Sequence, residues 1–311
     1  MDYRKLIKLG SSSHILSLPN DWLKKNKLKK GDLVYISENI NNELVLSPQL
    51  KEEKKGKQVT ITENNDLDDL NRKLISAYIS GYDIVNIKLK NLNNFRVIEN
   101  YLDSLMSFEI IEQTPNEIIA KDLLDIKEIS MEKIIRRIDI LIRAMIEETK
   151  ESHKLSNYED VYKRDQDINK LAFLSFRIIK KCFEYPKLTE YIGVKYNKLI
   201  DEWMLVFYLE KMADEVKRIS RYLTRSKDKS NKLKEIINLY LEVYEDYKRC
   251  MDAYYKKDIN TAYEMSKRKD IVMRKSNSLL EKNKDPYVFN IIDRTKALAN
   301  HIRDISRLIY Q

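Results

Sequence analysis

The chain has 311 residues, 34% of them charged and 43% hydrophobic, and its formal net charge is +9 at pH 7. This length allows two or three domains, and the positive charge favours an anionic partner without choosing between nucleic acid, phosphate and a membrane surface. No stretch reaches 18 apolar residues and the N-terminus lacks an apolar signal segment, so we expect a cytoplasmic protein with no transmembrane segment. Only five glycines and five prolines interrupt the chain, which favours long helices.

The first 50 residues predict a small β-rich domain. Short strands are expected at 3–9, 14–18, 33–37 and 43–47. A short helix capped by Asn20 or Asp21 separates the second strand from the third, and Gly31 provides the turn that follows it. So few residues cannot bury a core of their own, and we therefore expect a homodimer through this domain.

A charged linker at 51–56 precedes a second domain, at 57–125, with a βαβαββ pattern. Strands are expected at 58–62, 83–89, 108–113 and 117–123, and helices at 67–82 and 95–106. This order predicts a small α+β domain. Nothing in it names a ligand, so a spacer and a sensory domain both remain open.

The rest of the chain predicts helices alone. Six are expected, at about 130–152, 157–184, 188–224, 231–257, 259–282 and 287–310. Long helices joined by short loops pack as antiparallel bundles, and a basic loop at 225–229 divides these into two groups of three, at 129–225 and 231–311. The fold class is thus multidomain: a β-rich domain, an α+β domain and tandem three-helix bundles.

Two acidic pairs at i,i+4 spacing are candidate metal ligands. Glu210 and Asp214 share one helix face beside an apolar stripe, and Asp165 and Asn169 share a face of the preceding long helix. Oxygen ligands from neighbouring helices suit a hard cation. The alternative is that these are surface residues of a highly charged chain, with Lys211 and Lys217 as neighbours.

The N-terminal segment is strongly basic. Eight Lys or Arg and only two Asp occur in the first 30 residues, and Arg4, Lys5 and Lys8 lie along the first strand. A dimer doubles this charge, and contacts to DNA phosphates scale with such counts. A solvated protein face remains the alternative.

No catalytic signature accompanies these patterns. The sequence has no phosphate-binding glycine loop, nucleophile elbow or zinc-protease motif, so we expect no enzyme. Cys182 and Cys250 are far apart and are expected to be reduced core residues. His14, His153 and His301 are scattered and are expected to be structural or solvated.

Residues 3–47 resemble the AbrB/SpoVT swapped-hairpin family. The similarity is carried by Arg4–Lys8, by Ile15-Leu-Ser-Leu-Pro19, by Trp22 and by Lys30-Gly31-Asp32. The resemblance implies an intertwined dimer in which hairpins of both chains form one barrel. It also implies that Arg4, Lys5 and Lys8 approach DNA.

Residues 129–311 resemble PhoU, a tandem repeat of three-helix bundles. The similarity is carried by Leu209-Glu-Lys-Met-Ala-Asp-Glu215 and by the pattern from Val161 to Leu171. The resemblance implies a divalent or iron-type metal ion in the first bundle. Its ligands would be Asp165, Asn169, Glu210 and Asp214, although Asn169 replaces a carboxylate.

The second repeat departs from that pattern. Arg274 and Lys296 stand where carboxylates are expected, so this repeat should hold no metal, and these cations are candidates for binding an anion.

Together the two resemblances match an archaeal arrangement of phosphate uptake regulators. We therefore expect a DNA-binding transcriptional regulator with a helical part that senses metal or docks on a phosphate-transporter ATPase or another signalling protein. The alternative is an interaction module that binds no DNA and docks on a phosphate transporter or a kinase. An enzyme that uses the carboxylates on a metal is a weaker third reading.

Overall fold

A computed structural model describes residues 3–38, 43–49, 56–64, 66–90, 94–152, 157–226, 231–281 and 285–311. Within it the chain divides into two compact units, Met1–Gly56 and Lys57–Gln311. The expected linker at 51–56 coincides with the end of the first unit, but its residues 51–55 lie outside the described part of the chain. Each unit is described separately.

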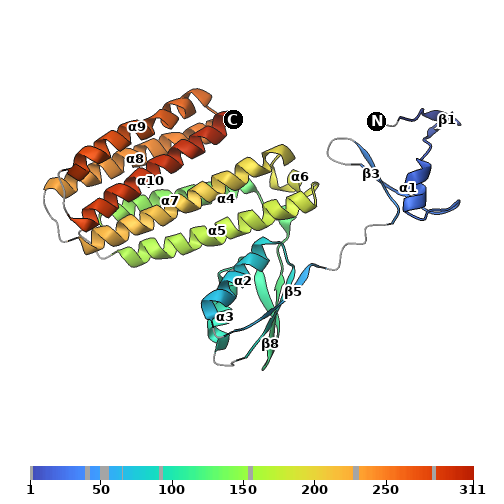
Figure 1. Ribbon diagram of the computed structural model, residues 1–311, viewed down its shortest axis with the longest axis horizontal. Helices are drawn as coiled ribbons and strands as arrows, with labels where there is room; N and C mark the ends of the chain where they lie inside the picture. The colour runs from blue at the N-terminus through green and yellow to red at the C-terminus, as the bar shows by residue number, and fades with distance from the viewer. Residues whose placement is uncertain are drawn as a thin grey trace. The chain divides into compact units, whose positions relative to one another are not determined.

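The N-terminal unit consists of two hairpins with a short helix between them (Figure 1). Its elements are β1 (Ile7–Leu9), β2 (Ser13–Ile15), α1 (Asn20–Lys25), β3 (Tyr35–Glu38) and β4 (Leu44–Ser47). β1 pairs with β2 and β3 with β4, both antiparallel, and the two hairpins form separate two-stranded sheets. The expected order is confirmed, but the first strand is shorter than expected, since it begins at Ile7 instead of Tyr3.

This unit contains no buried side chain among those described from Tyr3 to Gln49. Its large apolar side chains are exposed instead, with Leu33 at 72% and Tyr3 at 83%. Others that are exposed are Leu6, Ile7, Leu9, Ile15, Leu16, Ile36, Leu44 and Val45. A lone two-stranded hairpin is marginally stable in water. One copy of this unit therefore lacks the core that a folded domain needs.

The α+β domain is a four-stranded sheet covered on one face by two helices (Figure 1). Its elements are β5 (Gln58–Thr62), α2 (Leu67–Ile79), β6 (Ile84–Lys88), α3 (Phe95–Asp103), β7 (Phe108–Thr114) and β8 (Glu117–Asp122). The strand order is β5-β6-β8-β7; β5 and β6 are parallel and the other pairs antiparallel. Asp66 caps α2 by accepting a 3.0 Å hydrogen bond from the Asp69 amide. The βαβαββ prediction is confirmed.

The remaining described chain is helical after β8. Its elements are η2 (Ile126–Glu128), α4 (Met131–Lys150), α5 (Tyr158–Glu184), α6 (Leu188–Ile192), η3 (Tyr196–Lys198), α7 (Leu199–Arg225), α8 (Asn231–Lys256), α9 (Ile259–Glu281) and α10 (Pro286–Tyr310). The single helix expected at 188–224 is thus wrong in its first part. Gly193 adopts a left-handed conformation (φ 74°) that ends α6, and α7 starts after a further turn.

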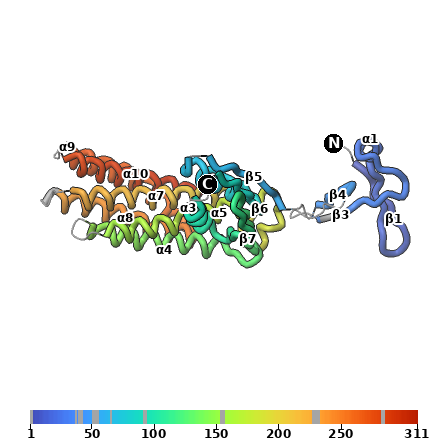
Figure 2. The backbone as a smooth tube through the Cα atoms, turned by 90° about the horizontal axis from the view of Figure 1, so that it is seen from below, coloured from blue at the N-terminus to red at the C-terminus, as the bar shows by residue number. Residues whose placement is uncertain are grey.

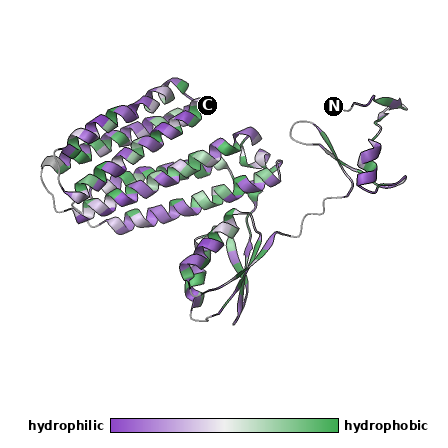
Figure 3. Ribbon diagram, viewed as in Figure 1, coloured by the Kyte–Doolittle hydropathy of each residue, from purple (hydrophilic) through white to green (hydrophobic). Residues whose placement is uncertain are grey.

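The long helices form two groups of three that share one apolar core. Within the first group α4, α5 and α7 contact one another, and within the second α8, α9 and α10 do so. α7 also packs on α10 and α4 on α8, which joins the groups, as Figure 2 shows from a second direction. Apolar and polar residues alternate along each helix (Figure 3), as expected for helices with one buried face.

A buried arginine attaches the α+β domain to the bundle. Arg177 of α5 is fully buried, and its guanidinium donates to the Tyr78 carbonyl at 2.6 Å and to the Tyr82 carbonyl at 2.8 Å. Its Nε donates to Asp122 of β8 at 3.0 Å. Lys181, one turn further along α5, donates to the same carboxylate at 3.0 Å. The α+β domain and the bundle are therefore linked by a fixed polar contact and not by a loose spacer.

Candidate DNA-binding surface and acidic clusters

The three predicted DNA-contacting residues lie on one exposed segment of the N-terminal unit. Arg4 and Lys5 precede β1, and Lys8 lies within it, opposite His14 of β2. All three side chains are exposed. Lys24 and Lys25, in the last turn of α1, are exposed as well. The first hairpin and α1 thus both present cations to solvent, and a surface of this kind suits phosphate contacts.

The acidic residues predicted as metal ligands meet between α5 and α7, but a lysine lies among them. Lys217 Nζ donates to Asp165 Oδ2 at 2.6 Å and to Asp214 Oδ1 at 2.9 Å. Glu210 is 2.9 Å from Lys211. Asn169 donates its amide to Asp165 at 3.5 Å. The helices therefore bring the predicted side chains together, and they bring an ammonium group with them.

Burial raises the pKa values of the carboxyl groups in this cluster, and pairing with cations lowers them. Burial raises the pKa of Asp165 despite the hydrogen bond from Lys217, and burial also raises the pKa of Glu210. Asp214 is half-buried, which would raise its pKa, but the hydrogen bond and charge of Lys217 and the charges of Lys211 and Arg218 hold its pKa below the usual range. The Asp165 Oδ1 atom is buried and has no hydrogen-bond partner among the described residues.

This arrangement does not fit a divalent cation as it stands. Such an ion needs several oxygen ligands converging on one point, without a competing positive charge. Among the residues that the structure describes, no three His, Cys, Asp or Glu side chains converge in this way. Lys217 also bonds to the two carboxylates that a cation would need. A metal at Asp165, Asn169, Glu210 and Asp214 stays a prediction that the donor geometry does not favour.

The second bundle contains an acidic pair that the sequence reasoning missed. Glu242 and Asp246 of α8 repeat the Glu-x-x-x-Asp spacing of Glu210 and Asp214. Arg268 of α9 donates to both, at 2.9 Å to Asp246 Oδ1 and 2.5 Å to Glu242 Oε1, and Lys275 donates to Glu242 at 2.7 Å. The i,i+4 spacing alone would have found this pair.

The residues of the second repeat that the sequence analysis names do not belong to this acidic pair. Arg274 and Asp270 of α9 are exposed, and Lys296 of α10 is half-buried. No hydrogen bond or ion pair joins these three among the described contacts. An anion site at Arg274 and Lys296 stays a prediction.

Both cysteines are buried and free, as expected. The Cys250 sulfur lies 3.3 Å from the Ser306 hydroxyl. His301 is half-buried beside Tyr208, and burial lowers its pKa, in keeping with a structural role. His14 is exposed, whereas His153 lies outside the described residues.

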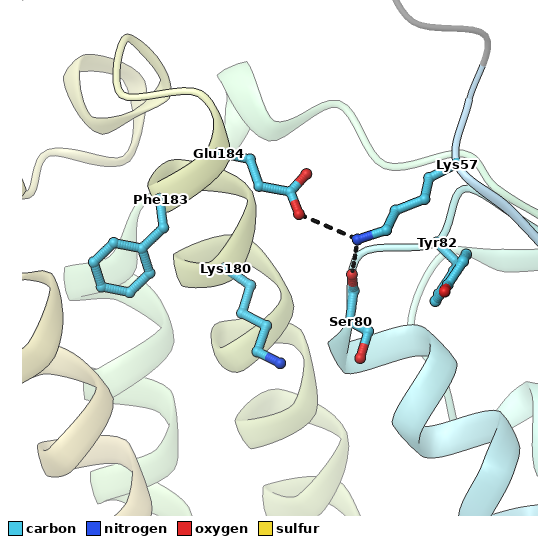
Figure 4. Close-up of a pocket in the computed structure, with 6 residues that line it drawn as sticks. All are labelled: Lys57, Ser80, Tyr82, Lys180, Phe183 and Glu184. Atoms are coloured by element: carbon cyan, nitrogen blue, oxygen red, sulfur yellow. Dashed lines mark hydrogen bonds and ion pairs between the residues drawn. The ribbon is translucent and has the colours of Figure 1, made fainter.

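An open pocket of about 480 Å³ lies where the α+β domain meets α5 (Figure 4). Lys57, the residue before β5, donates to Glu184 at 3.1 Å and to the Ser80 carbonyl at 2.9 Å. Tyr82, Lys180 and Phe183 complete its lining. No motif in the sequence predicts this pocket, because its walls come from segments far apart in the chain.

A known protein family matches the N-terminal unit. The family described as "Antidote-toxin recognition MazE, bacterial antitoxin" matches residues 7–57. The N-terminal unit is a MazE/AbrB-type domain. This confirms the type of domain that its residues predict, and domains of this type typically dimerise and bind DNA.

The helical part resembles PhoU. The crystal structure of PhoU from Pseudomonas aeruginosa superposes with a TM-score of 0.48 and 14% identity, over 58% of this chain and 93% of that one. No curated protein matches the chain. No helix in the described residues has the length and apolar character that crossing a membrane requires.

Proposed function

We propose that this protein is a dimeric DNA-binding regulator whose helical part governs its response. The observation that carries the proposal is the N-terminal unit, which belongs to a DNA-binding type and has no buried side chain among its described residues in a single copy. In a dimer the exposed apolar side chains of this unit would be buried against those of the second copy. Burial of each large apolar side chain contributes roughly 1.5–3 kcal/mol, so the ten exposed ones supply a strong drive to pair.

Pairing also sets the charge that faces DNA. Each copy contributes Arg4, Lys5 and Lys8, so a dimer presents six cations from these positions alone. If all six contact phosphates, the logarithm of affinity falls with the logarithm of salt concentration with a slope of about −5. This steep dependence is the signature expected of the proposed surface.

The helical part is proposed to carry the regulatory input, in phosphate uptake or a related response. Support comes from the attachment of the α+β domain to α5 through Arg177. Lys57, next to the first residue of β5, also donates to Glu184 of α5, so a movement of α5 would reach the start of β5. We propose that this input is the binding of a protein partner such as a phosphate-transporter ATPase. We also propose that the protein acts in the cytosol.

DNA binding is tested by titrating labelled genomic fragments with the full chain at several salt concentrations. Wild type should bind with the steep slope given above. Arg4→Ala/Lys8→Ala, which removes four cations from the dimer, should weaken binding and reduce the slope to about −2. Lys187→Ala/Lys195→Ala, which removes two exposed lysines of the helical part, is the matched control and should bind as wild type. Binding that is absent or independent of salt would refute the DNA-binding function.

A second candidate is a docking module that binds no DNA, and one surface favours it. The connection from α5 to α7 exposes Phe183, Tyr185, Tyr191, Tyr196 and Ile200. Phe183 and Tyr196 stack edge to face at 5.9 Å. Exposed lysines surround them, namely Lys180, Lys187, Lys195 and Lys198.

This surface suits an acidic partner segment with apolar side chains. The DNA titration separates the two functions. A dimer that binds no DNA but binds an acidic aromatic peptide, and loses it on Tyr185→Ala/Tyr196→Ala, would establish docking alone.

A further inference from the structure

The cluster between α5 and α7 contains its own cations. Its predicted ligand carboxylates are Asp165, Glu210 and Asp214. Lys217 contacts two of them as described, and Lys211 lies 2.9 Å from Glu210. Arg218, which pairs with Glu215 at 2.7 Å, also lies 3.9 Å from Asp214. A divalent ion placed here would add two charges to carboxylates that are already paired with cations, and its nearest neighbours would be lysines.

Asp165 is buried, so it needs Lys217 as a counter-charge. The Asp165 side chain is only 3% exposed, and that of Lys217 only 15%. A buried carboxylate without a counter-charge is strongly destabilising, whereas one hydrogen-bonded to a cation is tolerated. Lys217 meets this need for Asp165 and satisfies Asp214 on its own helix, one turn away, at the same time.

The second bundle repeats the arrangement with different residues. Its Glu-x-x-x-Asp pair, Glu242 and Asp246, contacts two cations of the neighbouring helix, Arg268 and Lys275. Both acidic side chains are paired, and Asp246 is the more buried of the two, with 7% of its side chain exposed. Two independent sites in the bundle thus pair acidic side chains at this spacing with cations of the chain itself.

We propose that Lys217 and Arg268 serve as resident cations of the two bundles, in the positions where metal ions would otherwise neutralise the acidic pairs. The helical part therefore folds and functions without metal. Its regulatory input is then a protein partner or another ligand, and not the occupancy of a metal site. Because Asp165 Oδ1 has no hydrogen-bond partner among the described residues, removal of Lys217 should leave a carboxylate open to an external cation.

The test uses the purified full chain and Mn²⁺ as the probe. Elemental analysis should find no stoichiometric metal on wild type, and a chelator or added Mn²⁺ should leave its Tm unchanged. Lys217→Met should lower Tm by roughly 5–10 °C, and Mn²⁺ should restore a large part of that loss. Lys198→Met, which removes a lysine from an exposed pair with Asp201 outside the cluster, is the matched control and should behave as wild type.

Three results would overturn the proposal. They are stoichiometric metal on wild type with a Tm that a chelator lowers, a Lys217→Met variant as stable as wild type, or a destabilised variant on which Mn²⁺ has no effect. Should Lys217→Met fail to fold, Lys217→Gln replaces it, because its amide can still donate to one of the two carboxylates. The wild-type measurement decides the metal question without either variant.

Discussion

Replacing Arg177 with methionine should release the α+β domain from the bundle. Arg177 is fully buried, and Asp122, its acidic partner, has only 3% of its side chain exposed. Methionine keeps much of the length and apolar volume but leaves the Tyr78 and Tyr82 carbonyls without their donor. Breaking a buried ion pair by removing one partner costs about 3–5 kcal/mol. Since Lys181 still contacts Asp122, we expect the lower end, about 3 kcal/mol.

The assay is thermal unfolding of the full chain together with hydrogen exchange of α2 and β8. A loss of about 3 kcal/mol corresponds to a Tm lowered by roughly 6–12 °C in a unit of this size. The amides of α2 and β8 should exchange faster, while those of α10 change less. The control is Arg136→Ala, which breaks an exposed i,i+4 pair with Glu132 and should change Tm little.

A double-mutant cycle with Asp122→Asn tests whether the two side chains act together. The double variant should lose clearly less stability than the sum of the two single losses, because Asp122 no longer carries an uncompensated charge. If Arg177→Met destabilises the chain no more than Arg136→Ala does, the attachment of the α+β domain does not depend on this arginine and the reasoning is refuted.

Three smaller predictions follow from other contacts. Burial would raise the pKa of Asp83, but the hydrogen bond and charge of Lys181 hold that pKa below the usual range. The Asp83 carboxylate therefore stabilises the folded chain at neutral pH, and this stabilisation is lost below about pH 4. In urea titrations the difference in unfolding free energy between wild type and Asp83→Asn should disappear at that pH, and a difference that does not change with pH would contradict this. Gly193→Ala should cost about 1–2 kcal/mol in the same titrations, because a residue with a Cβ is strained at φ 74°; no loss would mean that the chain accommodates a Cβ at this turn. Tyr247→Phe removes the donor of a buried 2.8 Å hydrogen bond to Asp139 and should cost about 1–3 kcal/mol by thermal unfolding, whereas an unchanged Tm would show that the remaining donors, Arg143 and Tyr255, suffice.

The order of elements followed from the sequence because its apolar periodicity is strong. The strand at 58–62 was predicted at its observed bounds, and five of the six bundle helices were placed within a few residues of theirs. The break at Gly193 was missed, since a lone glycine is tolerated within a helical pattern and only its left-handed conformation ends α6. The first strand was overextended, because alternation shows where a strand can form but not where a partner strand is present.

The candidate site was predicted only in part, because spacing along a helix shows which residues share a face but not which residues meet across two helices. Spacing placed Glu210 with Asp214 and Asp165 with Asn169, and the structure brings these pairs together. Spacing along one helix gave no sign that Lys217 reaches Asp165 on another helix. Arg177 was overlooked because a charged residue is normally assigned to the surface. These contacts depend on how helices pack, and a single sequence records that only indirectly.

The mass of the full chain in solution, measured by sedimentation at micromolar concentration, tests most directly whether the exposed apolar side chains of the N-terminal unit are covered by a second copy. The proposed regulator should sediment at twice the 37.1 kDa of one chain, and Leu16→Asp/Leu33→Asp should bring it down to a single chain. A wild-type chain that sediments as a monomer while the amides of its first hairpins remain protected from exchange would contradict the account.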